Sequence, residues 1–97
     1  MVPLFVLSYG YHDTPLRAER RGDHVAHLER LKAEGALVVA GPMADQSGGM
    51  IIFDAEDEAA ARALVEQDPY TRLGVTKDRQ LREWRVTVGS LAAGSAD

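Results

Sequence analysis

Hydrophobic residues gather in four short runs along the chain, and each run predicts a β-strand. The first run, VPLFVLSY at residues 2–9, is apolar at consecutive positions, as is typical of a strand covered on both faces. The runs ALVVA at 36–40 and MIIF at 50–53 are also continuous, and the polar, glycine-containing stretch between them predicts a hairpin. Residues 81–88 form the fourth predicted strand.

Between the first two runs, the spacing of apolar residues changes to that of a helix over residues 23–34. His24, Leu28 and Leu31 recur at the intervals that place side chains on one helical face. Gly35 follows, where a glycine commonly ends a helix. A short helical turn is predicted at 15–20, because Pro15 suits the first position of a helix.

A second helix is predicted at residues 58–67, where four alanines favour helix. Asp57 is its expected N-cap, and Asp68-Pro69 ends it, since a residue before proline is driven out of the helical region. Residues 70–78 are predicted to form a loop.

The elements therefore follow the order βαββαβ, which predicts an α+β, ferredoxin-like fold with an antiparallel sheet. Two helices cover only one face of four strands, yet the first and second strands lack a polar side. A second copy of the chain packed sheet against sheet is the simplest cover, so we expect a homodimer. Residues 1–88 form the one predicted domain, and the small, polar residues 89–97 are expected to be a flexible tail.

Composition narrows the classes of partner. The 97 residues carry a net charge of −4 and no basic run, which argues against a nucleic-acid partner. Without cysteine the chain has neither disulfides nor thiolate chemistry. The apolar start is too short for a membrane span and lacks the positive flank of a signal peptide. We expect a cytoplasmic protein with no membrane partner.

His24 is the side chain with the most chemistry, because an imidazole within an apolar stripe needs a partner that offsets its desolvation. It is either a core histidine bonded to backbone or a general acid or base facing a pocket. His27 and His12 raise the question of a metal, but no motif fixes a third ligand. We therefore expect no metal and no organic cofactor, and interpret His27 as a solvated residue at the rim.

Several short motifs occur in an order that resembles the YciI-like (YCII-related) domain family. The resemblance covers nearly the whole chain up to Trp84 and departs from the family in one place, where Glu83 precedes Trp84 instead of the common proline. The matching positions are an Arg-x-x-His at the head of the first helix, a glycine after it, Gly-Pro after the second strand and Asp-Pro-aromatic after the second helix: Arg21, His24, Gly35, Gly41, Pro42, Asp68, Pro69 and Tyr70.

The resemblance implies a dimeric α+β barrel and a His–Asp pair that moves protons on small molecules, including ring compounds, in lyase or isomerase chemistry. The implied pair is His24 with Asp68, and no cofactor is expected. The non-catalytic alternative is a ligand-binding or accessory module with the same pocket, and a cofactor-free oxygenase is a third reading. The candidate substrate-binding residues are Tyr9, Arg21, Gly41, Pro42 and Tyr70.

Topology makes the pair testable. In this fold the first helix begins, and the second helix ends, at the end of the sheet where the first strand finishes. We therefore predict that His24 and Asp68 lie together at this end, roughly 2.6–3.2 Å apart if their contact is direct. Tyr9, at the end of the first strand, is expected at the same end of the sheet.

Overall fold

The predicted element order is confirmed, including the short helix predicted at 15–20, and one further short helix follows Asp68. The first strand ends at Tyr11 rather than at Tyr9. The computed structural model describes residues 3–91. The elements are β1 (Leu4–Tyr11), α1 (Leu16–Glu19), α2 (Arg21–Ala33), β2 (Leu37–Pro42), β3 (Gly48–Asp54), α3 (Glu58–Gln67), α4 (Pro69–Arg72) and β4 (Thr76–Trp84).

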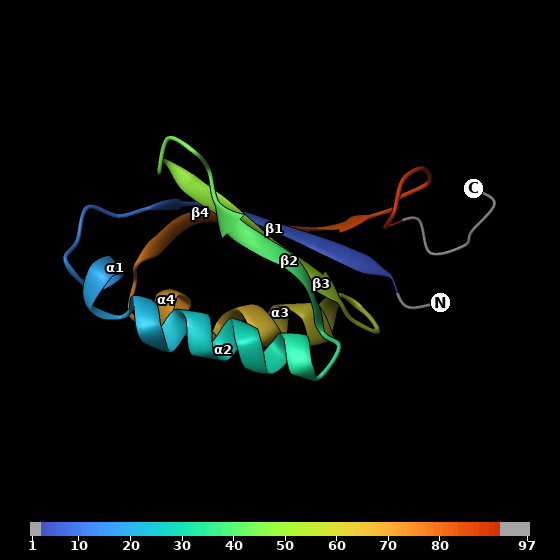
Figure 1. Cartoon of the computed structure of the whole chain (residues 1–97), viewed down its shortest axis with the longest axis horizontal. Coiled ribbons are helices and arrows are strands. Elements are labelled where there is room, and N and C mark those ends of the chain that lie inside the picture. The colour runs from blue at the N-terminus through green and yellow to red at the C-terminus, as the bar shows by residue number, and fades with distance from the viewer. Residues whose placement is uncertain (1–2, 92–97) are drawn as a thin grey trace.

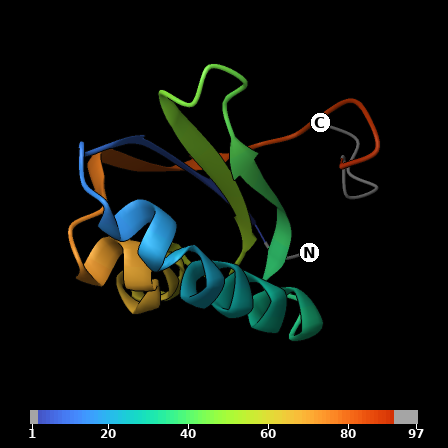
Figure 2. The same ribbon diagram turned by 60° about the vertical axis from the view of Figure 1, so that its left-hand side comes forward.

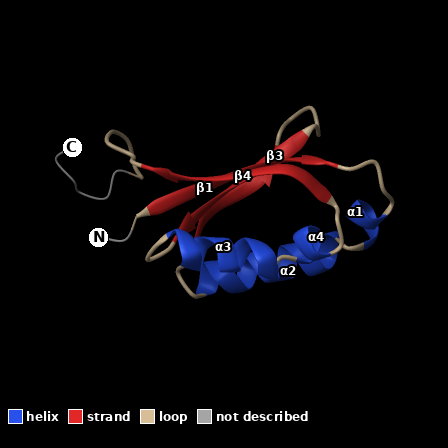
Figure 3. Ribbon diagram, turned by 180° about the vertical axis from the view of Figure 1, so that it is seen from behind, coloured by secondary structure: helices blue, strands red, loops and turns tan. Residues whose placement is uncertain are grey.

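The four strands form one antiparallel sheet in the order β2-β3-β1-β4. The two helix-bearing crossovers place all helices on one face of this sheet, as Figures 1 and 3 show. This is the ferredoxin-like arrangement, in which β3 and β1 occupy the centre and β2 and β4 form the edges. The predicted hairpin of β2 and β3 is confirmed.

The core lies between the sheet and the helices. In β1 the buried side chains are Phe5, Leu7 and Tyr9, which alternate as a strand requires. Their partners across the β1–β3 ladder are Phe53, Ile51 and Gly49, which share the same face because directly opposed residues do. The helices contribute Leu31, Ala61 and Val65 to the same cluster.

Local signals determine where the helices begin and end. The Asp57 carboxylate accepts a hydrogen bond from the Ala60 amide at 2.8 Å, so the predicted N-cap of α3 is confirmed. After α2, Gly35 has a φ of +80°, the left-handed conformation that glycine adopts without strain. Asp68 ends α3 and also caps α4, since its carboxylate accepts the Tyr70 amide at 2.9 Å.

The prediction for the last strand was wrong at both ends. β4 spans Thr76–Trp84, not residues 81–88, and α4 occupies the start of the predicted loop at 70–78. The polar start TKDRQ resembles a loop, but β4 is an edge strand with most of its residues exposed, so it needs no apolar pattern. Pairing with β1 ends at the Leu4–Trp84 pair, which leaves residues 85–88 outside the sheet.

Two further expectations concern the ends of the chain and membranes. Of the predicted tail at 89–97, residues 90–91 lie in a turn and residues 92–97 lie outside the described residues. Within residues 3–91, no helix has both the length and the apolar character that a membrane crossing requires.

The sheet face away from the helices carries an apolar surface. The strand registers identify its residues, because two residues directly opposite each other on neighbouring strands point to the same face of the sheet. Val39 is 51% exposed and Trp84 is 42% exposed, which is high for large apolar side chains. We call this the outer face, and its apolar members are Leu4, Val6, Val39, Met50, Ile52 and Trp84.

Gly48 and Gly49 lie at the start of β3 rather than in the hairpin loop, because the chain there passes close to Tyr9. A Cβ at Gly48 would lie 2.0 Å from the Tyr9 carbonyl oxygen, and one at Gly49 would lie 2.5 Å from the Tyr9 hydroxyl. Only a residue without a side chain therefore fits at these two positions.

We expect Gly48→Ala and Gly49→Ala each to lower the free energy of unfolding by about 1–3 kcal/mol, the usual cost of overpacking. Gly22→Ala is the matched control. It lies in the first turn of α2 with no atom within 4 Å of an added Cβ, so alanine there should be neutral or stabilising. Urea titration of the three variants tests this, and equal stability of all three would contradict the close approach.

Candidate functional site

The imidazole of His24 and the carboxylate of Asp68 form a direct, buried hydrogen bond. His24 lies in the first turn of α2, and Asp68 lies 44 residues away between α3 and α4. The Nδ1–H of His24 donates to Oδ1 of Asp68 at 2.8 Å, within the predicted range. Because an ionised carboxylate only accepts, the neutral imidazole carries its proton on Nδ1 and leaves Nε2 as a free acceptor.

The phenol ring of Tyr70 stacks on the imidazole of His24. The two rings are parallel to within 3°, with centroids 3.9 Å apart. The Tyr70 hydroxyl donates to the carbonyl oxygen of Arg17 at 2.6 Å, and its amide donates to Asp68. Tyr70 is buried, and burial raises the pKa of its phenol. It is therefore placed to fix the orientation of the imidazole, a role that the sequence did not predict for this candidate substrate-binding residue.

His24 lines a cleft of about 540 Å³ between α2 and β2. All five candidate substrate-binding residues line this cleft: Tyr9, Arg21, Gly41, Pro42 and Tyr70. Asp68 is not among the lining residues and supports His24 from behind. Trp84, where the sequence departs from the family pattern, lies on the outer face and does not line this cleft.

Tyr9 brings a neutral phenol to the same cleft. Burial is the main reason that the pKa of Tyr9 is raised, and the neighbouring Tyr11 and Asp68 add to the effect. The Tyr9 and Tyr11 rings meet edge to face with centroids 5.6 Å apart. A phenol that holds its proton is a hydrogen-bond donor for an oxygen of a bound ligand.

Two arginines border the cleft near its histidine. The guanidinium of Arg17 lies 3.7 Å from the centre of the Tyr11 ring and also donates to the side-chain oxygen of Gln46. Arg21, a candidate substrate-binding residue, lines the cleft, while its neighbour Arg20 pairs with Asp23 at 3.7 Å.

His27 was misinterpreted as a solvated rim residue, for it is only 2% exposed. It lies next to the predicted stripe of His24, Leu28 and Leu31 around the helix, on the side of α2 that is buried. Its Nδ1 accepts from the Arg30 guanidinium at 3.2 Å, while its Nε2 has no hydrogen-bond partner within residues 3–91. His24 and His27 thus engage different partners, and over the described range no three metal-ligating side chains form a group.

Burial lowers the pKa of His27 below its usual value of 6.5, against a smaller opposing effect of Asp68. The folded chain therefore binds this proton less readily than the unfolded chain does. Its contribution to stability is complete above about pH 6.5 and is lost as the pH falls below that value.

We expect His27→Leu to gain stability relative to the wild type as the pH falls from 7.5 to 5.5, because leucine has no proton to bind. Urea titrations at both pH values measure the difference, with His12→Leu as a control at an exposed loop histidine. A His27→Leu difference that is constant with pH would contradict this reading.

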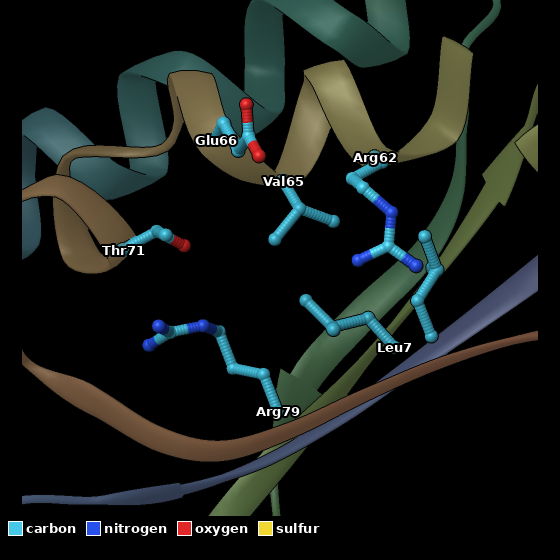
Figure 4. A pocket seen from close by; sticks show the side chains of 7 residues that line it. Leu7, Arg62, Val65, Glu66, Thr71 and Arg79 are labelled. Carbon is cyan, nitrogen blue, oxygen red and sulfur yellow. The ribbon is translucent and has the colours of Figure 1, made fainter. Parts of the chain in front are cut away.

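A second, smaller hollow of about 270 Å³ lies between α3 and β4. Arg62 from α3 and Arg79 from β4 flank the apolar side chain of Val65 there (Figure 4). Arg79 donates to the carbonyl and hydroxyl oxygens of Thr76, at 2.6 and 2.9 Å. The hollow is lined by no histidine, so the α2–β2 cleft is the candidate for proton-transfer chemistry.

Comparison with known proteins places these residues in a wider context. The sequence profile of the YCII-related domain matches residues 4–85. The uncharacterized protein YjpA of Bacillus subtilis is 30% identical over 83 residues, covering 80% of this chain and 96% of YjpA. Protein YciI of Escherichia coli is 36% identical over 69 residues, covering 61% of this chain and 70% of YciI.

One solved structure has a similar fold and a bound small molecule. It is 5-chloro-2-hydroxyhydroquinone dehydrochlorinase (TftG) from Burkholderia phenoliruptrix in complex with 2,5-dihydroxybenzoquinone. The TM-score is 0.72 with 28% sequence identity, and the match covers 84% of this chain and 92% of TftG.

Proposed function

The chain belongs to the YCII-related domain family, and we propose that it is a cofactor-free enzyme that transfers protons on a small hydroxylated ring compound. The observation that carries this proposal is the buried 2.8 Å contact between His24 and Asp68 at the cleft. The structural similarity to a dehydrochlorinase supports the reaction class, which is elimination or the related isomerisation.

The Nε2 atom of His24 acts as the base. It accepts a proton from a ring hydroxyl, and the electron pair of that O–H bond moves into the ring system. The imidazolium returns the proton to a ring carbon, and an isomerisation ends there, with a carbonyl in place of the hydroxyl. In an elimination, the ring carbon that received the proton also bears the leaving group. His24 then accepts a second hydroxyl proton, the electron pair of that O–H bond moves through the ring, and the carbon releases its leaving group with the bonding electrons, so the net loss from the substrate is one proton and one anion.

Asp68 orients His24 for this proton transfer. Its negative charge stabilises the imidazolium that forms, and its hydrogen bond keeps Nε2 directed away from the carboxylate. Asp68 is itself held by the Tyr70 amide, and Tyr70 stacks on the imidazole, so the base has little freedom to rotate. The Tyr9 hydroxyl is placed to donate to a substrate oxygen on which negative charge develops.

The assay that tests this proposal uses the purified full chain with 5-chloro-2-hydroxyhydroquinone under nitrogen, which prevents air oxidation. We expect one chloride released per molecule of substrate, at a rate proportional to protein concentration. Chloride release no faster than in buffer, together with no binding of 2,5-dihydroxybenzoquinone by calorimetry, would contradict the proposal. Binding of that quinone without chloride release would favour the ligand-binding module.

We further propose that the chain is a homodimer in which two outer faces pack against each other. The helices cover only the opposite face of the sheet, and the outer face contains six apolar residues, of which Val39 and Trp84 are well exposed. Apolar surfaces of this kind commonly mark protein interfaces. In a twofold dimer the sheet of each subunit would be covered on both faces, as the continuous apolar sequence of β1 implies.

A further inference from the structure

The α2–β2 cleft extends beyond His24 along α2. β2 leaves the C-terminal end of α2 close to the helix and rises away from its N-terminal end, as Figures 1 and 2 show. The α2 wall consists of a single stripe at helical spacing, from Arg21 through His24, Val25 and Leu28 to Lys32. The lining of the cleft therefore reaches along the helix from His24 to Lys32.

The two ends differ in chemistry. The end at His24 holds the imidazole, the phenols of Tyr9 and Tyr70 and the arginines at positions 17 and 21. The stretch toward Lys32 is lined by half-buried apolar side chains, Val25 and Leu28 from α2 and Leu37 and Val38 from β2. Glu29 and Lys32 supply the charged groups beyond them.

A single ring does not fill this space. Lys32 lies eight positions after His24, and eight steps along an α-helix rise about 12 Å. The cleft volume of about 540 Å³ lies in the range of sites that enclose a whole drug-sized ligand rather than one small ring. A ring held by His24 would leave the apolar stretch exposed to water, which costs free energy in proportion to its area.

We propose that the ligand of this cleft has two parts: a small hydroxylated ring beside His24 and an apolar chain on that ring. The chain lies along Val25, Leu28 and Val38 toward Lys32. This inference rests on the proposed function for the position of the ring, and it adds the second part of the substrate.

The test compares two probes by calorimetry on the full-length protein: 2,5-dihydroxybenzoquinone and the same quinone with an n-hexyl chain on a ring carbon. Full burial of one methylene raises affinity about fourfold. With six carbons partly enclosed, we expect the hexyl compound to bind at least ~50-fold more tightly.

A variant pair shows where the chain lies. Val25→Thr with Val38→Thr keeps the shape of both side chains but makes the walls polar, so the affinity ratio of the two probes should fall at least ~5-fold, since each lost apolar contact weakens the chain alone. Val88→Thr is the control, because Val88 is 86% exposed and does not line the cleft.

Each outcome has a distinct meaning. Equal affinity of the two probes overturns the inference and leaves the proposed function standing. A hexyl gain that the Val25→Thr/Val38→Thr variant retains in full places the chain elsewhere and also overturns it. Failure of the unsubstituted quinone to bind, with no chloride release, removes the proposed function and the inference together.

Discussion

Replacing His24 with asparagine is expected to lower kcat for chloride release by about 10²–10⁴-fold, the usual contribution of a positioned general base. Asparagine approximates the shape of the imidazole and keeps an amide that can donate to Asp68, so the fold and the binding of the quinone should persist. The chloride assay measures kcat, and calorimetry in the same variant measures binding. His12→Asn is the control, because His12 is an exposed loop residue.

Asp68→Asn should lower kcat less than His24→Asn does, because it weakens the base without removing it. The amide oxygen can still accept from the Tyr70 amide and cap α4, so the local structure should survive. If the two residues act as a unit, the double variant loses no more activity than His24→Asn alone. Full activity in His24→Asn, or losses that multiply in the double variant, would contradict a His–Asp unit.

Val6→Lys is expected to convert a dimer into monomers. Val6 lies on the outer face in central β1, directly opposite Arg82 of β4, so the new ammonium would be buried beside a like charge at the proposed interface. Removing water from an unpaired charge costs several kcal/mol. Light scattering at micromolar concentration should give twice the 10.6 kDa chain mass for the wild type and one chain mass for the variant.

Val88→Lys is the control for this experiment, because Val88 is exposed and lies beyond the end of β4. It should leave the mass unchanged. A wild-type chain that is monomeric at these concentrations, or a Val6→Lys variant that remains a dimer, would contradict packing through the outer face.

The sequence predicted the parts of the fold that depend on local signals. The bounds of α3 were predicted to the residue, because Asp57 caps one end and Asp68-Pro69 closes the other. β4 was misplaced because an edge strand pairs on one side only and tolerates a polar sequence, so periodicity gives little indication of it. The short α4 was missed because four residues are too few to show a helical pattern.

The site shows the same division. Topology predicted that His24, Asp68 and Tyr9 lie at one end of the sheet, because element order alone decides at which end of the sheet each helix and strand begins or finishes. The stacking of Tyr70 on His24 depends on the path of the chain after Pro69, which the sequence did not reveal. His27 was misjudged because its burial depends on how α2 rotates against α3, and a short apolar stripe does not fix that rotation.

The most direct test of the central claim is a crystal structure of the chain with 2,5-dihydroxybenzoquinone. We expect a ring in the α2–β2 cleft, with one of its oxygens about 2.6–3.2 Å from Nε2 of His24 while Nδ1 stays bonded to Asp68. A ring in the α3–β4 hollow, or a cleft-bound ring whose oxygens all lie beyond the reach of one bridging water from Nε2, would contradict it.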